Sequence, residues 1–274
     1  MKENYRRREA PRRDREAFRR DREPVEEVEG QLEGRNALTE ALKSGRTIDK
    51  VFIAAGETDR GLQRLAAEAK EAGAVVVPVD RRKLDAMSTT HSHQGVIALA
   101  AAREYYTIDD ILQEAADRGE TPLIIICDEL SDPHNLGAIL RSGECAGAHG
   151  VIIPKRRSVG LTATVAKASA GAVEYMKVAR VTNINAAMEE LKQKGVWIFG
   201  TAAEGSVPMY QADLTGPTAI VIGSEGDGMS RLVRQNCDVT VHIPMKGKIT
   251  SLNASAAASI LLYEAVRQRI SKEG

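Results

Sequence analysis

The sequence predicts an α/β protein with two folded domains and a charged N-terminal tail. The larger part, 108–274, alternates short apolar runs with helical segments, which is typical of a mostly parallel sheet covered by helices on both faces. A smaller part, 29–102, shows the same βαβ alternation over a shorter length, so we expect a small mixed sheet there. Residues 1–28 lack the apolar side chains that either pattern requires.

The N-terminal 28 residues carry dense charge of both signs and few apolar side chains. Such a segment cannot bury enough apolar surface to offset the entropy lost on ordering, so we expect a disordered tail. Arginines crowd residues 1–23, although the whole chain has 38 basic and 38 acidic residues and no net charge. An Arg-rich tail can add nonspecific contacts with phosphates, and that role is compatible with disorder.

In the small domain, the segment GRNALTEALKSG has apolar residues at helical spacing and ends at Gly45. The further expected elements are a strand over 49–55, a helix over 61–73 that Gly73 closes, and strands over 74–79 and 93–101. Residues 103–107 form the expected linker into the larger domain.

In the large domain, the short apolar runs predict a series of strands. They cover 123–127, 150–154, 174–180, 196–202, 218–223 and 239–244, and helices are expected to begin near Asn135, Ile184, Met229 and Asn253.

Composition and missing motifs exclude several classes of protein. No run of about 18 apolar residues exists, so no membrane span is expected. The three cysteines, Cys127, Cys145 and Cys237, lie far apart, which argues against a zinc site or a disulfide framework and fits a reducing cytoplasm. No GxxxxGK[ST], GxGxxG, GxSxG or HExxH motif occurs, so P-loop, Rossmann-type, hydrolase-elbow and zincin chemistry are not expected.

Three polar segments follow predicted strands and are the candidates for the site. The first, DELSDPHNLGAILR (128–141), is a Pro-containing loop that enters a helix, with Asn135 expected near the helix N-cap and Arg141 about 9 Å further along the axis. Taken alone, it reads equally well as a capped helix with one surface arginine.

The second and third candidate segments lie nearer the C-terminus. AIVIGSEGDGM (219–229) is a strand that runs into a glycine-rich loop, where backbone can approach a ligand closely. In the third, Ser251 or Asn253 can cap the helix that follows, and the small residues of 254–259 allow that helix to pack closely on neighbouring backbone. An Ala-rich core helix explains the small residues but leaves the polar Ser-Leu-Asn at its start unexplained.

In order and spacing, the three segments together strongly resemble the three motifs of the SpoU 2′-O-ribose methyltransferases of the SPOUT superfamily. Residues 29–102, with GRNALTEAL and HSHQGVIALA, resemble the small RNA-binding domain that precedes the catalytic domain in one branch of the family. The resemblance implies an α/β catalytic domain whose C-terminal segment forms a deep trefoil knot. It also implies homodimers, with each site completed across the interface.

The resemblance implies a function and a set of site residues. The expected cofactor is S-adenosylmethionine, and the expected substrate is a ribose 2′-hydroxyl of ribosomal RNA, most specifically a guanosine of the large-subunit 23S RNA. No metal and no membrane are expected as partners. The implied catalytic residues are Arg141, Asn135, Glu225, Ser251 and Asn253, and the implied cofactor-binding residues are Thr201, Gly223, Ile243 and Leu252.

Two alternatives to this function remain open from the sequence. One keeps the chemistry with a transfer RNA as substrate, but tRNA-specific relatives usually carry short terminal helices in place of a domain such as 29–102. The other is a catalytically inactive RNA-binding assembly factor, which the presence of all five matched polar residues disfavours.

Overall fold

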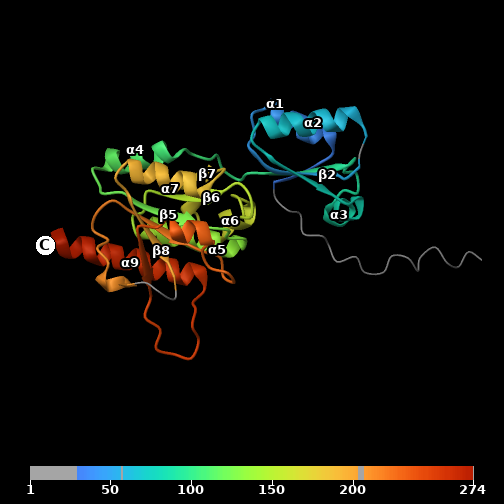
Figure 1. The fold of residues 1–274 in the computed structure, drawn as a ribbon. Helices are drawn as coiled ribbons and strands as arrows, with labels where there is room; N and C mark the ends of the chain where they lie inside the picture. The colour runs from blue at the N-terminus through green and yellow to red at the C-terminus, as the bar shows by residue number, and fades with distance from the viewer. Residues whose placement is uncertain (1–29, 57, 203–206, 274) are drawn as a thin grey trace, which may run out of the picture.

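The computed structural model describes residues 30–56, 58–202 and 207–273, which form two domains with separate sheets (Figure 1). The predicted disordered tail, 1–28, lies outside the described residues and stays a prediction.

The small domain is a four-stranded mixed sheet in the order β1-β4-β2-β3. Strands β2 and β3 are parallel, whereas β4 is antiparallel to both β1 and β2. The elements are β1 (Gln31–Glu33), α1 (Arg35–Lys43), β2 (Ile48–Ala54), α2 (Arg60–Glu71), β3 (Val75–Val79), α3 (Arg81–Met87) and β4 (Val96–Ala100). The expected mixed sheet is present, and β1 and α3 are additions to the predicted elements.

The large domain has a seven-stranded sheet in the order β7-β6-β5-β10-β8-β11-β9, and every neighbouring pair is parallel. Its strands are β5 (Leu123–Cys127), β6 (Gly150–Pro154), β7 (Lys177–Val181), β8 (Trp197–Thr201), β9 (Val207–Pro208), β10 (Thr218–Ile222) and β11 (Val239–His242). Its helices are α4 (Ile108–Arg118), α5 (Pro133–Cys145), α6 (Ala163–Ala168), α7 (Ile184–Gln193), α8 (Arg231–Gln235) and α9 (Ala254–Glu273), with 3-10 turns at Ala172–Glu174 and Met209–Gln211.

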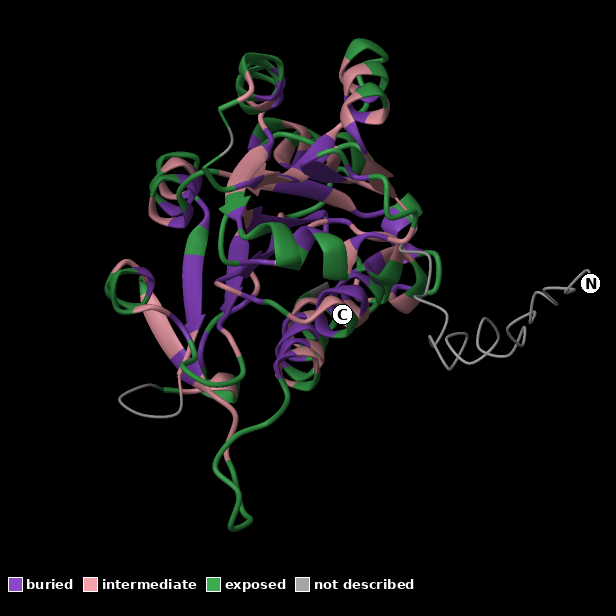
Figure 2. Ribbon diagram, turned by 90° about the vertical axis from the view of Figure 1, so that its right-hand side faces the viewer, coloured by how far each residue is buried: buried purple, intermediate pink, exposed green. Residues whose placement is uncertain are grey.

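Helices cover both faces of this sheet, as the sequence pattern predicts (Figure 1). One core packs α5, α6 and α9 on the first face, with Leu136, Val165 and Leu261 fully buried. The other packs α4, α7 and α8 on the second face, around Ile111 and Met188. The central strands are buried along their whole length (Figure 2), which explains why they read as continuous apolar runs rather than alternating ones.

The helix expected near Met229 is present as α8, which begins at Arg231; Met229 is buried in the second core, and the Ser230 N–H donates to the Asp128 carboxylate at 2.7 Å. Other predicted boundaries are wrong. The strand expected from residue 174 begins at Lys177, after a 3-10 turn. Helix α4 was not predicted, although Thr107 and Asp110 cap it reciprocally.

Candidate functional site

The predicted cofactor residues lie at one edge of the sheet. Thr201 ends β8, Gly223 follows β10 directly, and Ile243 follows β11 directly. These strands are neighbours and parallel, so their carboxyl ends meet at the same edge. In open α/β sheets this edge is where ligands bind.

Gly223 is held in a place where only glycine fits. A Cβ there would lie 2.2 Å from the carbonyl carbon of Gly228 and from the nitrogen of Met229. The loop folds back on itself because Ser224 N donates to the Gly228 oxygen at 3.0 Å and Gly228 N to the Ser224 oxygen at 3.1 Å. This turn carries Glu225 at its exposed tip.

Asp128 fastens this loop to the end of β5, a role the sequence reading missed. The residue is 3% exposed; its backbone N–H donates to the Ile222 oxygen, and its carboxylate accepts from Ser230 N. It therefore connects both ends of the loop 223–229 to the strand that leads into α5. An acidic residue directly after an apolar strand was the only signal available.

Helix α5 begins earlier than predicted. Its N-cap is Asp132, whose carboxylate accepts from His134 N at 2.9 Å, and Pro133 occupies the first helical position. Asn135 is therefore inside the first turn rather than at the cap, and its side chain is free to reach other elements. It is 6% exposed.

Asn253 caps α9; the sequence predicts either Ser251 or Asn253 in this role. Its Oδ1 accepts from Ser255 N at 2.9 Å and from Ala256 N at 3.3 Å. With the oxygen used at the helix end, the amide nitrogen points away and donates to Asn135 Oδ1 at 2.9 Å. Ser251 is exposed and does not cap the helix.

The orientation of one amide determines the next. Since Asn135 Oδ1 accepts from Asn253, its Nδ2 must donate elsewhere, and it donates to Glu225 Oε1. The three predicted motifs are thus joined by the hydrogen-bonded chain Asn253–Asn135–Glu225, which we call the amide cluster. It runs from the N-terminus of α9 to the glycine-rich loop.

Small residues bring α9 close to α5, as predicted for 254–259. Ala254 and Ala258 are buried in the first core, and Ser259 Oγ lies 2.8 Å from Ser142 Oγ on α5. Ser142 follows Asn135 by seven residues and so shares its helix face. This close packing holds Asn253 against Asn135.

Arg141 lies on α5 outside the amide cluster. Six residues beyond Asn135, it is rotated roughly 120° around the helix axis. The side chain is exposed, and no hydrogen bond or ion pair joins it to another residue in the part of the chain that the structure describes. Its guanidinium is therefore available to a ligand or to another chain.

Leu252 belongs to a long loop between β11 and α9 that projects from the domain (Figure 2). Leu252 is 40% exposed, Met245 38% and Ile249 75%. Ile243, at the start of the loop, packs against the first core. The loop thus begins at the sheet edge with Ile243 and presents exposed apolar side chains beyond it.

Cys237 lies beside β8, the strand that ends in Thr201. Its sulfur would lie 2.5 Å from a Cβ at Gly200. Burial raises the pKa of Cys237 to about 12, so it stays a neutral thiol near neutral pH and is a poor nucleophile. Among the described residues, no three His, Cys, Asp or Glu side chains gather as a metal site would require. No helix in the described ranges is long and apolar enough to cross a membrane.

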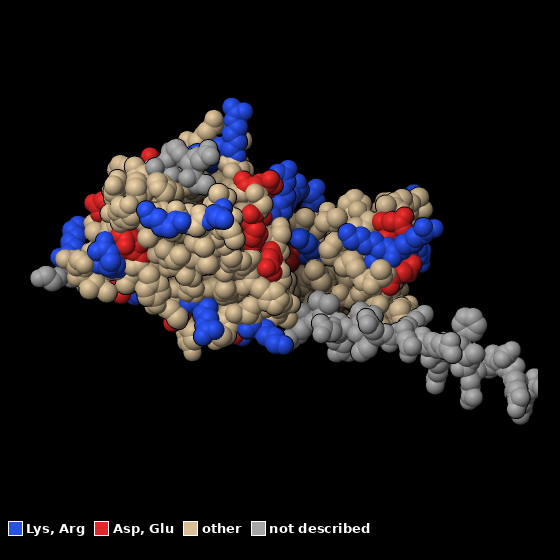
Figure 3. All heavy atoms as spheres, turned by 90° about the horizontal axis from the view of Figure 1, so that it is seen from below, with Lys and Arg blue, Asp and Glu red and all other residues tan. Residues whose placement is uncertain are grey.

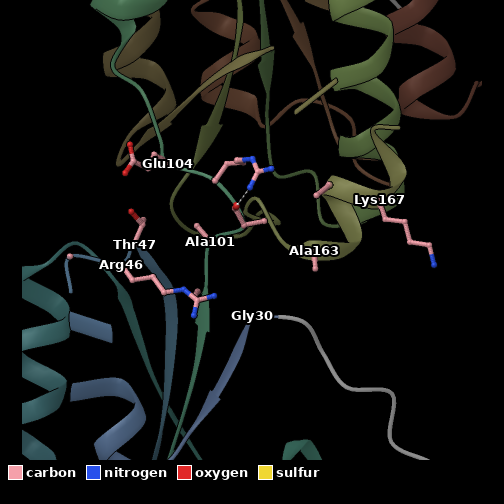
Figure 4. Close-up of a pocket in the computed structure, with 12 residues that line it drawn as sticks. Gly30, Arg46, Thr47, Ala101, Glu104, Ala163 and Lys167 are labelled. Carbon is pink, nitrogen blue, oxygen red and sulfur yellow. Dashed lines mark hydrogen bonds between the residues drawn. The ribbon is translucent and has the colours of Figure 1, made fainter. Parts of the chain in front are cut away.

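A cavity of about 650 Å³ lies elsewhere, between the two domains (Figure 4). Arg46 and Thr47 line it from the small domain, Ala163 and Lys167 from the large one. It contains none of the predicted cofactor or catalytic residues.

Comparison with known proteins assigns both domains. Residues 122–263 match the model of the SpoU rRNA Methylase family, and residues 31–106 match that of the RNA 2′-O ribose methyltransferase substrate binding domain. The chain is 49% identical over 236 residues to the Bacillus subtilis protein YacO, named as a TrmH family tRNA/rRNA methyltransferase, covering 86% of this chain and 94% of that protein. It is 44% identical over 240 residues to the 23S rRNA (guanosine-2′-O-)-methyltransferase RlmB of Ralstonia nicotianae, covering 87% and 95%.

Among solved structures, the fold is similar to that of the SpoU methyltransferase AviRb from Streptomyces viridochromogenes in complex with the cofactor AdoMet. The TM-score is 0.57 at 27% identity, and the match covers 88% of this chain and 92% of that one. The family match spans more than half of the sequence, and the relatives match nearly all of both domains. The chain therefore belongs to the SpoU methylase family.

Proposed function

We propose that this protein transfers a methyl group from S-adenosylmethionine to a ribose 2′-hydroxyl of RNA, and that the target is a guanosine of 23S ribosomal RNA. The observation that carries the proposal is the amide cluster, because it brings polar residues from all three family motifs to the sheet edge that ends in Gly223. The activity named for the Ralstonia relative supports the choice of target.

The residues at the sheet edge suit a cofactor of this kind. Thr201, Gly223 and Ile243 offer backbone groups at three neighbouring strand ends, and Leu252 offers an apolar surface for an adenine ring. S-adenosylmethionine supplies an already activated methyl group, so the protein's task is to orient the attacking oxygen and stabilise it as its proton leaves.

We assign this stabilisation to Arg141. A guanidinium has a pKa above about 12, so it is a poor general base, but its charge and planar donors suit a phosphate or a developing alkoxide. The absence of a partner for Arg141 among the described residues leaves those donors available. Asn135 and Glu225 would then hold the substrate side of the site, with Ser251 and Asn253 near the ribose or its phosphate.

The distribution of charge supports an RNA partner. Figure 3 shows Lys and Arg side chains on both domains and beside the hollow where they meet, interspersed with Asp and Glu. Phosphates are the dominant electrostatic feature of RNA, and recognition of structured RNA also uses 2′-hydroxyls and exposed loop bases. The substrate-binding domain at 31–106 gives such recognition a surface separate from the methyl-transfer site.

We further propose that the protein is a homodimer that acts in the cytoplasm, where ribosomal RNA would be its substrate. Helix α9 is apolar on more than one side: its inner face is buried, while Ile260, Tyr263 and Ile270 form an exposed stripe. An uncovered apolar stripe on a core helix favours a second copy of the chain. In that dimer, Arg141 would complete a site across the interface. Within each chain, the segment from β11 to α9 would form the family's trefoil knot.

Two other functions compete with this one. A tRNA substrate keeps the same chemistry, and the name of the Bacillus relative leaves it open. The substrate-binding domain favours the larger RNA. A non-catalytic assembly role is disfavoured because Asn135, Glu225 and Asn253 are not only present but joined by hydrogen bonds.

The decisive experiment incubates the purified full-length protein with S-adenosylmethionine and either 23S rRNA or total tRNA, then maps 2′-O-methylation at nucleotide resolution. The expected result is methylation of one guanosine of 23S rRNA. Methylation of tRNA alone would select the tRNA alternative. Cofactor binding without methylation of either RNA would favour the assembly role.

A further inference from the structure

A buried polar cluster joins the two domains. It consists of Asp49 on β2, Tyr105 in the linker and Arg180 on β7. Arg180 Nη1 donates to Asp49 Oδ1 at 2.6 Å, and Nη2 donates to the Asp49 backbone oxygen at 3.0 Å. The Tyr105 hydroxyl donates to Asp49 Oδ1 at 2.8 Å. The side chains of Asp49 and Arg180 are 5% and 6% exposed, so solvent hardly reaches the pair.

The backbone around this cluster is closely fitted. Leu161 N donates to the Tyr105 hydroxyl at 2.9 Å, and Ala102 N donates to the Leu161 oxygen at 2.6 Å. A Cβ at Gly160 would lie 2.2 Å from Asp49 Oδ2. The carboxylate of the small domain thus sits against large-domain backbone at a point where no side chain could be accommodated.

The linker is also bound to the large domain. Tyr106 N donates to the Val178 oxygen at 2.9 Å, so the linker runs alongside β7. The Arg180 guanidinium lies 5.2 Å from the centre of the Tyr105 ring, a cation–π distance. Tyr105, which contacts Asp49, is therefore itself bound to the large domain through Leu161 and Arg180.

A buried ion pair resists partial separation, because moving either partner away leaves a charge without compensation in a poorly solvated place. The contacts should therefore hold one relative orientation of the domains rather than a range. The cavity between the domains depends on this orientation, since its walls come from both (Figure 4).

We infer that Asp49, Tyr105 and Arg180 form an interdomain latch that fixes the substrate-binding domain relative to the methyl-transfer site and so determines which nucleotide of a bound RNA is methylated. The three are positioning residues: none belongs to the amide cluster or the cofactor edge. The inference rests on the proposed RNA methylation. In it, the junction between the domains sets where an RNA held by the substrate-binding domain lies relative to the methyl-transfer site.

The test uses full-length protein carrying Tyr105→Phe, which removes one hydroxyl, or the double change Asp49→Asn/Arg180→Gln, which removes both buried charges together and limits misfolding. The readouts are the maximum dimension from small-angle X-ray scattering, KM and kcat for 23S rRNA, and the map of methylated nucleotides. The latch predicts a larger maximum dimension, an increased KM, little change in kcat, and methylation of additional nucleotides.

The size of the KM change follows from the fraction of molecules in which the two domains keep the relative orientation seen in the structure. A variant that holds it for about a tenth of the time should show an apparent affinity lower by about tenfold. The matched control is Lys194→Gln, which removes an exposed ion-pairing lysine of the large domain and should leave all readouts unchanged. Affinity for S-adenosylmethionine, measured by calorimetry, should be the same in every variant and serves as the test of folding.

Three outcomes would overturn the latch: scattering and KM both as in the unmodified protein, a loss confined to kcat, or a loss of cofactor affinity, which would indicate a general structural role. If the unmodified protein methylates no RNA, the proposed function fails. The scattering comparison would still show whether these residues fix the domain orientation.

Discussion

Asn253 donates a hydrogen bond to Asn135 over 2.9 Å although 118 residues separate them in the chain. The contact has a fixed polarity, because Asn253 Oδ1 is occupied at the N-terminus of α9. That polarity passes through Asn135 to Glu225 in the glycine-rich loop. A helix cap thus orients the polar groups of the candidate site.

Replacing Asn253 should therefore affect both stability and activity. Asn253→Ala removes the α9 cap, which typically costs about 1 kcal/mol, and leaves the buried Asn135 oxygen without its donor. We expect a lower free energy of unfolding in urea and a loss of methyl transfer. Ser255→Ala is the control, since it removes only a hydroxyl that donates to the same Asn253 oxygen. If both changes had equal effects on stability and methyl transfer, Asn253 would not act by orienting Asn135 and Glu225.

The glycine-rich loop offers a sharper pair of variants. Gly223→Ala places a methyl group 2.2 Å from backbone atoms of Gly228 and Met229, so the loop must move, whereas a Cβ at Gly226 meets nothing within 4 Å. We expect Gly223→Ala to lose S-adenosylmethionine binding in calorimetry. Gly226→Ala should bind as the unmodified protein does. Normal binding by Gly223→Ala would remove this loop from the cofactor site.

Arg141 should contribute to the chemical step and not to cofactor binding. Arg141→Ala removes its charge and its planar donors, and Arg141→Lys removes only the planar donors. We expect both variants to bind S-adenosylmethionine normally and to lose most of the methyl-transfer rate on RNA. Near-normal turnover by Arg141→Ala would exclude it as the catalytic group.

His149 should make the stability depend on pH. It is 2% exposed; burial lowers its pKa, although Glu120 at 3.0 Å opposes the shift. Its Nδ1 accepts from Leu123 N at 3.0 Å, which requires a neutral ring nitrogen. Because the folded protein binds this proton less readily than the unfolded chain, the stabilisation is complete above the ordinary pKa of 6.5 and is lost as the pH falls below it.

The corresponding measurement is urea unfolding at pH 7.5 and 5.5, values chosen roughly one unit on either side of that pKa. The unmodified protein should lose stability at the lower pH. His149→Asn keeps an acceptor near Leu123 but does not titrate, so its stability should change less between the two. The same pH dependence in both proteins would show that another group is responsible.

The Arg-rich tail should affect RNA affinity without affecting site choice. Deleting 1–28 removes Arg–phosphate contacts, so RNA affinity should fall less steeply with salt concentration. Deleting 1–103 should also abolish selective methylation, because the substrate-binding domain is lost. The comparison is an RNA titration at several salt concentrations with methylation mapping. Equal loss of selectivity in both deletions would make the tail the specificity element.

The sequence by itself determined the class of fold and the family, and it pointed to the three segments that meet in the candidate site. Continuous apolar runs such as 123–127 indicate buried parallel strands because both faces of each strand are covered, and that property is local. The small residues of 254–259 indicate close helix packing, which is also a property of the local sequence. The start of α4 is marked only by the polar capping box of Thr107 and Asp110, which follows the expected linker directly, and this helix is therefore missed in the sequence analysis.

Only the tertiary structure decided which polar groups meet. Asn135 is expected near a helix N-cap; the cap itself is Asp132, which leaves the Asn135 side chain for the amide cluster. The sequence places Asp49 and Arg180 in predicted strands and Tyr105 in the linker but does not show that they meet, since the partner of a single acidic residue in a strand is known only once a distant arginine is seen beside it. Hydrogen bonds and ion pairs are made across large sequence separations, and local periodicity contains no information about their partners.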